Sequence, residues 1–127
     1  MSRAEGPGRA AIVRFVRETL GCGCPDEVFE QISDSGPGEL RRIALGGRLL
    51  VYLIRPTEAG LTADRLGDYL SRGRGERDAL GFNRVRLVIA DEAATEREDL
   101  QAAFEDLRAG DERLHLHIVP AAALPGT

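Results

Sequence analysis

The sequence predicts an α/β fold in which a mixed four-stranded sheet carries helices on both faces. Apolar stretches of strand length alternate with stretches of helical period, in the order α-α-β-β-α-β-α-β. The glycine pair Gly46-Gly47 between two apolar runs is typical of a tight β-hairpin. We therefore expect an N-terminal helix pair, a β-hairpin and then a β-α-β-α-β unit. A two-layer version, with helices on one face only, is the alternative.

The length of the chain predicts a single domain. Its 127 residues match the usual size of one domain, and 43% of them are hydrophobic, which is enough to form a core. We expect one domain over residues 1–127, with frayed ends at 1–7 and 121–127.

The N-terminal region predicts two helices. Apolar residues recur at helical spacing over residues 8–20, and Gly21 is expected to end this helix in the left-handed conformation. A short second helix should begin after Cys24, because Pro25 suits the first helical position. The glycine- and proline-rich stretch 34–39 then predicts a turn.

Residues 39–56 predict the hairpin. A two-residue turn at the glycine pair would place Leu45 opposite Arg48. The second strand is apolar at every position, so we expect it to be covered on both sides. The first strand carries Arg41 and Arg42, which favours a place at the sheet edge.

The second half predicts two strand–helix alternations. Thr62 should cap a third helix, which the glycines of 71–78 would interrupt, and 83–92 is typical of a buried strand. A capping box at 95–98 predicts the fourth helix, and the alternating stretch 113–120 predicts the last strand. Helices that join strands imply parallel pairing with right-handed crossovers.

Composition excludes several function classes. All 17 basic residues are arginines, so lysine-dependent chemistry such as a Schiff base is impossible. The net charge of −4 and the aromatic content of 5% argue against a nucleic-acid partner. The longest apolar run, Leu49 to Ile54, is too short to cross a membrane, and no apolar leader is present. We therefore expect no membrane association and a cytoplasmic location.

The two cysteines, Cys22 and Cys24, are the main chemical lead. They lie in the stretch TLGCGCPD, at the start of the predicted second helix. Backbone amides and the helix dipole at such a position lower the pKa of a thiol, although Asp26 and Glu27 act in the opposite direction. We predict thiol-based redox or sulfur-transfer chemistry without a cofactor, with Cys24 as the attacking thiolate and Cys22 as the resolving partner.

Other interpretations of the cysteines and of the two histidines stay open. The cysteines can be unreactive apolar residues at a helix corner. They can also bind zinc or copper, either alone or together with His115 and His117, which share one face of the last strand. The two histidines can equally be the polar side of a half-exposed strand. Besides a thiol protein and a metal-binding module, the chain can be a non-catalytic interaction domain. Such a domain would bind a protein partner or form a homodimer through an edge strand or an uncovered sheet face.

Two further charged groups are weaker candidates. Asp91 and Glu92 follow a predicted parallel strand, where α/β folds bind ligands, but they also suit an ordinary loop. Arg72, Arg74 and Arg77 can hold a phosphate, or they can be neutralised by the acidic residues between them.

Overall fold

The computed structural model describes residues 7–21, 23, 25–36, 38–56, 62–91 and 97–125. Within these residues it forms one mixed sheet of five strands in the order β1-β2-β3-β4-β5. The strands are β1 (Ile32–Asp34), β2 (Leu40–Leu45), β3 (Leu49–Ile54), β4 (Arg84–Ala90) and β5 (Leu114–Val119). The pairs β1–β2 and β2–β3 are antiparallel, whereas β3–β4 and β4–β5 are parallel. The predicted fold class is confirmed, with one strand more than expected.

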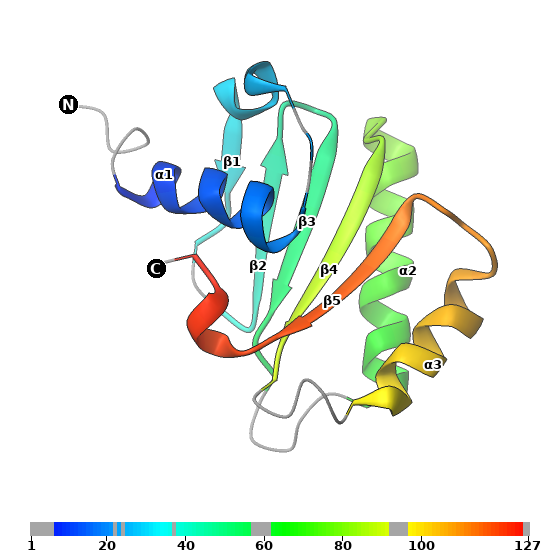
Figure 1. Cartoon of the computed structure of the whole chain (residues 1–127). Helices are drawn as coiled ribbons and strands as arrows, with labels where there is room; N and C mark the ends of the chain where they lie inside the picture. Colours follow the sequence, from blue (N-terminus) through cyan, green and yellow to red (C-terminus); the bar gives the residue numbers. More distant parts are fainter. Residues whose placement is uncertain are drawn as a thin grey trace.

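Helices cover both faces of this sheet (Figure 1). One face carries α1 (Pro7–Arg14), its π-helical continuation η1 (Phe15–Thr19), the short turn η2 (Asp26–Glu30) and the C-terminal turn η4 (Ala121–Ala123); the other carries α2 (Ala63–Leu80) and α3 (Glu98–Arg108). Of the helices in the described part of the chain, none is long and apolar enough to span a membrane.

A separate apolar cluster fills the space on each side of the sheet. The cluster under α1 includes Ile12, Val16, Phe29, Ile43, Leu45, Leu49, Val51 and Leu53. The cluster under α2 and α3 includes Leu50, Tyr52, Ile54, Leu66, Leu70, Leu87, Leu100 and Phe104. Strand β3 contributes alternate residues to both clusters, as its uninterrupted apolar sequence predicts.

The additional strand is β1, which directly follows η2. Ile32 pairs with Leu45, and the pairing continues to Asp34. The prediction that β2 is an edge strand is therefore wrong, because β1 covers it. Arg41 is only 7% exposed and forms an ion pair with Asp34, with 2.6 Å between Nη2 and Oδ2. The charge of Arg41, which suggested an edge strand, is thus neutralised by Asp34 of β1.

The hairpin turn forms at the predicted glycines but with a different register. Gly46 and Gly47 have φ of 59° and 68°, and the Arg48 amide donates to the Leu45 carbonyl at 3.0 Å. The ladder, however, pairs Leu45 with Leu49, so that Arg48 is an additional residue in the connection. The predicted pairing of Leu45 with Arg48 is wrong by one residue.

Hydrogen bonds to the next strand account for this shift. The Arg48 carbonyl accepts from the amides of Asn83 at 2.7 Å and Arg84 at 3.2 Å, so Arg48 is bonded to the beginning of β4. A shift of one residue moves side chains to the opposite face of a sheet. Leu50 consequently pairs with Ala44 and packs under α2.

Helix α2 is continuous, and the predicted interruption at 71–78 is wrong. Thr62 caps it as predicted, since its Oγ1 accepts from the Arg65 amide at 3.2 Å. A Cβ atom at Gly73 would lie 3.1 Å from Val85 Cγ1 and 3.5 Å from the Tyr52 ring. This glycine therefore allows the helix to approach the sheet closely. Two residues of the predicted capping box before α3, Thr95 and Glu96, lie outside the described residues.

Part of the C-terminal stretch 121–127, which we expect to be frayed, is placed against the core. Leu124 is 9% exposed and belongs to the apolar cluster under α1. The Pro125 carbonyl accepts a hydrogen bond from Arg41 Nη1 at 3.4 Å.

Candidate functional site

The cysteines of the predicted thiol site, Cys22 and Cys24, lie outside the described residues. Their neighbours Gly21, Gly23 and Pro25 are described, and all three are exposed. Gly21 has a φ of 71°, which confirms the predicted left-handed end of the first helical segment. These neighbours locate the path of the chain on either side of each cysteine.

The predicted short second helix is a single 3-10 turn, η2, and Pro25 is its N-cap rather than its first residue. The helix dipole acts within the first turn and grows with the number of aligned peptide units. A turn of five residues therefore contributes little to the local electrostatics.

A pocket of about 320 Å³ lies at the amino-terminal ends of β3 and β4, on the face that carries α1. Three chain segments line it: Gly21, Gly23, Pro25 and Val28 from the region around η2, Arg48 and Leu49 from the hairpin, and Asn83, Arg84 and Arg86 from the beginning of β4. Val28, Leu49 and Arg86 are buried and form its floor, whereas the other six residues are more exposed and form its mouth.

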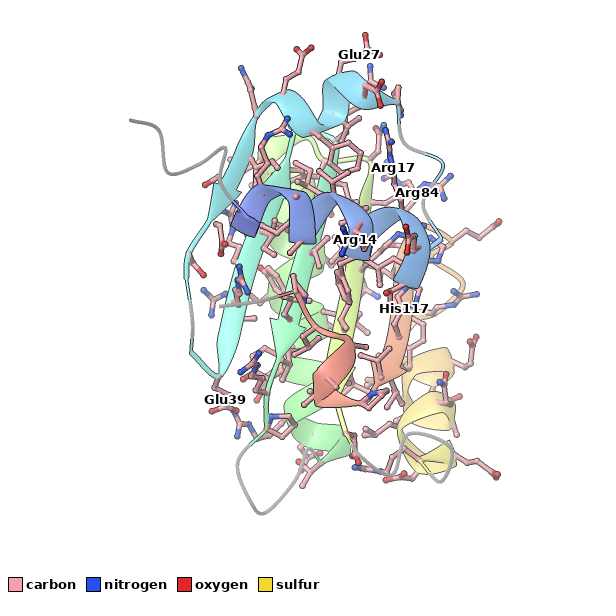
Figure 2. The ribbon with its side chains drawn as sticks, turned by 60° about the vertical axis from the view of Figure 1, so that its left-hand side comes forward. Arg14, Arg17, Glu27, Glu39, Arg84 and His117 are labelled. Atoms are coloured by element: carbon pink, nitrogen blue, oxygen red, sulfur yellow. The ribbon has the colours of Figure 1, made fainter. Side chains whose placement is uncertain are left out.

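Three arginines, Arg48, Arg84 and Arg86, give this pocket its positive charge. We therefore call it the arginine pocket. Arg84 and Arg86 are two residues apart on β4, so both side chains point to the same face of the sheet. Arg84 and His117 lie beside the end of the N-terminal helical segment (Figure 2). Within the described part of the chain, none of the three arginines forms an ion pair with a carboxylate.

Arg86 differs from the other buried arginines. Arg41 and Arg77, which are similarly buried, pair with Asp34 and Asp111 at 2.6 and 2.8 Å. Arg86 is 8% exposed and donates instead from Nη1 to two neutral acceptors, the Leu20 carbonyl at 3.3 Å and His117 Nε2 at 3.0 Å. Its Nε is buried and has no hydrogen-bond partner among the described residues.

The electrostatics of the arginine pocket favour negative charge. Burial, and to a smaller extent the positive charge of Arg84, lowers the pKa of Arg86. Arginine nevertheless remains charged, because its ordinary pKa is above 12. A buried charge of this kind is stabilised when an anion approaches it.

The two histidines lie on one side of β5, as predicted. Leu114, Leu116 and Ile118 face the cluster under α2 and α3, which leaves His115 and His117 on the face of α1. Because a guanidinium has no acceptor, Nε2 of His117 must accept the hydrogen bond from Arg86. The histidine pair therefore belongs to the surroundings of the arginine pocket.

Burial and neighbouring arginines lower the pKa of both histidines, which favours their neutral forms. Burial, followed by the charge of Arg86 and by His115, lowers the pKa of His117 to about 4. Burial and the charges of Arg86, Arg84 and Arg108 lower the pKa of His115 in the same direction. Its Nε2 is buried and has no partner among the described residues.

These surroundings oppose a metal ion at the histidines. Nε2 of His117 already accepts from Arg86, and the adjacent positive charges repel a cation. No cluster of three or more metal-ligating side chains occurs in the described part of the chain. Since Cys22 and Cys24 are outside that part, the zinc or copper site remains a prediction.

The other charged candidates make contacts within the fold. Asp91 forms an ion pair with Arg97 at 2.5 Å, and Glu92 lies outside the described residues. These contacts favour the interpretation of Asp91 as part of an ordinary loop.

The predicted phosphate-binding arginines stand on the continuous helix α2. Arg77 and Arg74 approach Asp111 at 2.8 and 3.8 Å, and Arg72 lies over the Tyr52 ring. Their acidic and aromatic neighbours favour a structural role.

Sequence reasoning missed the arginine pocket. The available signal was the pattern Arg84-Val85-Arg86-Leu87, which places two arginines on one face of an otherwise apolar strand. Nothing in the sequence indicated that Arg48 and the loop around the cysteines would meet this face. Comparisons with protein-family models, with curated proteins and with solved structures give no match for this chain.

Proposed function

We propose that this chain is a thiol protein in which Cys24 is the attacking thiolate and Cys22 the resolving thiol. One observation supports the proposal: the described neighbours of both cysteines line the pocket that contains Arg48, Arg84 and Arg86. The proposal includes a cytoplasmic location, where such a pair is kept reduced.

Electrostatics provide the physical reason. Nearby cationic side chains stabilise a thiolate and lower the pKa of a thiol below its ordinary value of about 8.5. Asp26 and Glu27 would raise it; Asp26 forms an exposed ion pair with Arg17, and both carboxylates act against the arginines. In this proposal the arginine pocket, rather than the helix dipole, lowers the thiol pKa.

The redox form of the reaction is an exchange with a disulfide. The Cys24 thiolate attacks one sulfur of the substrate disulfide, which forms a mixed disulfide and releases the first substrate thiolate. The Cys22 thiolate then attacks Cys24 sulfur, which releases the second substrate thiolate and leaves the Cys22–Cys24 disulfide. Two electrons pass from the cysteine pair to the substrate disulfide.

The sulfur-transfer form needs a persulfide as the donor. Attack of the Cys24 thiolate on the outer sulfur of the donor forms a Cys24 persulfide and releases the donor as a thiolate. No electron source beyond the persulfide is required, because the transferred sulfur retains its oxidation state.

Alkylation of the thiols as a function of pH tests the proposal. We expect the more reactive thiol to have a pKa below about 8.5 in the natural chain, and higher by ~0.5 in Arg84→Gln. Arg55→Gln is the matched control, because Arg55 is also exposed but follows the opposite end of β3. This variant should leave the thiol pKa unchanged.

Single cysteine variants assign the two roles. With a small disulfide as substrate, Cys22→Ser should accumulate the mixed disulfide at Cys24, whereas Cys24→Ser should react slowly or not at all. A thiol pKa at or above about 8.5 that is the same in the natural chain, in Arg84→Gln and in Arg55→Gln would contradict the mechanism. The metal-binding module and the interaction domain with a protein partner or second copy would then be the remaining predictions.

A further inference from the structure

We propose that the arginine pocket binds the carboxylate or phosphate group of a small molecule, and that this group selects the substrate of the proposed thiol reaction. The residues that would hold it are Arg48, Arg84 and Arg86. Its role as a substrate site rests on the proposed function, but binding of the anion does not require the cysteines.

The unbalanced charge is the first argument. Buried arginines in proteins are normally paired, and Arg41 and Arg77 of this chain follow the rule. Arg86 is as deeply buried and lies close enough to Arg84 for their charges to repel. An oxyanion between them would relieve this repulsion.

The rigidity of the site is the second argument. Nη1 of Arg86 is held from two sides, by the Leu20 carbonyl and by His117 Nε2. The Arg48 carbonyl accepts from the amides of Asn83 and Arg84, so two hydrogen bonds join the hairpin to the beginning of β4. A donor that is positioned before binding, as Nη1 of Arg86 is, loses little conformational entropy when the ligand arrives.

The dimensions of the pocket are the third argument. A volume of about 320 Å³ is at the lower end of the range for small-molecule sites, and it exceeds the size of a single phosphate. The buried floor of Val28 and Leu49 is apolar, whereas the arginines and Asn83 supply polar groups. The pocket therefore suits an organic anion, such as a disulfide or persulfide with a carboxylate near its sulfur.

Binding is tested first without the thiols. Inorganic phosphate and acetate are titrated separately into Cys22→Ser/Cys24→Ser at constant ionic strength, with chloride as the reference anion, and the amide resonances of Gly21, Gly23 and Asn83 are followed. We expect saturable shifts with at least one of the two oxyanions, and the difference between them identifies the preferred group.

Arginine variants test the location. Arg84→Gln should weaken binding about fivefold or more, and Arg55→Gln should not change it. Arg84 is exposed, so its replacement keeps the test valid even if Arg86→Gln does not fold. Shifts that do not saturate, or equal affinity in Arg84→Gln, would overturn the proposal, whatever the thiol pKa is.

Substrate preference is tested in the natural chain. Glutathione disulfide carries carboxylates, whereas cystamine is a cationic disulfide of related chemistry. We expect the ratio of their rate constants to favour glutathione disulfide and to fall about fivefold in Arg84→Gln. A ratio that Arg84→Gln leaves unchanged would overturn the substrate role of the site.

Discussion

Replacement of Gly46 by alanine should destabilise the fold more than replacement of Gly47, although both glycines belong to one turn. Both have positive φ, 59° and 68°, and alanine in this conformation costs about 1–2 kcal/mol. A Cβ atom at Gly47 meets nothing within 4 Å, but one at Gly46 would lie 2.8 Å from the Val28 carbonyl oxygen and 3.0 Å from its Cα. These are backbone atoms, which cannot rotate away.

The steric term adds to the conformational one. Overpacking of this kind costs about 1–3 kcal/mol, so we expect a loss of ~1–2 kcal/mol for Gly47→Ala and ~2–5 kcal/mol for Gly46→Ala. Urea unfolding measures both. With a slope of about 1.5 kcal/mol per molar urea, the two midpoints should differ by ~0.7–2 M. Equal losses in the two variants would show that η2 does not pack against the hairpin turn, and the geometry of the pocket floor would then be wrong.

Three further predictions test the packing and the electrostatics. In α2, Gly75→Ala should stabilise the chain by ~0.5–1 kcal/mol. Gly73→Ala should not, because its Cβ would lie 3.1 Å from Val85 Cγ1. Equal gains of the two variants in urea unfolding would contradict this difference. Leu124→Ala should cost ~2 kcal/mol, and a loss below about 0.5 kcal/mol would mean that the C-terminal segment does not contribute to the core. The ring of His117 should titrate with a pKa of about 4 by NMR, and a pKa near its ordinary value of 6.5 would contradict its burial beside Arg86.

The lowered pKa of His117 also predicts the direction of a pH dependence. Between about pH 6.5 and pH 4 the unfolded chain binds a proton at this residue and the folded chain does not. Its contribution to stability is therefore complete above about pH 6.5 and is lost as the pH falls toward 4. Comparison of unfolding with that of His117→Asn across this range isolates the contribution, and an identical pH dependence in both chains would contradict it.

Local features of the fold were predictable where one segment decides them. The glycines at the hairpin have the positive φ that their residue type allows, Gly21 ends its helical segment in the same way, and Thr62 caps α2. The alternation around His115 and His117 correctly assigned the two faces of β5.

Features that depend on distant partners were not predictable. Strand β1 has only three residues, too few for a recognisable period, and it forms because β2 offers its edge. The role of Gly73 depends on Val85 and Tyr52, which are far away in sequence. The register of the hairpin depends on hydrogen bonds from the beginning of β4.

The sequence by itself determined the fold class, the apolar strands and the position of the two cysteines between helical segments, because periodicity and residue type act over a few neighbouring residues. Only the tertiary structure decided which charges meet. Arg48, Arg84 and Arg86 come from a turn and a strand that are separated along the chain, and they converge beside the residues that flank Cys22 and Cys24. Electrostatic potential depends on distance in space, so a pattern along the sequence does not contain it.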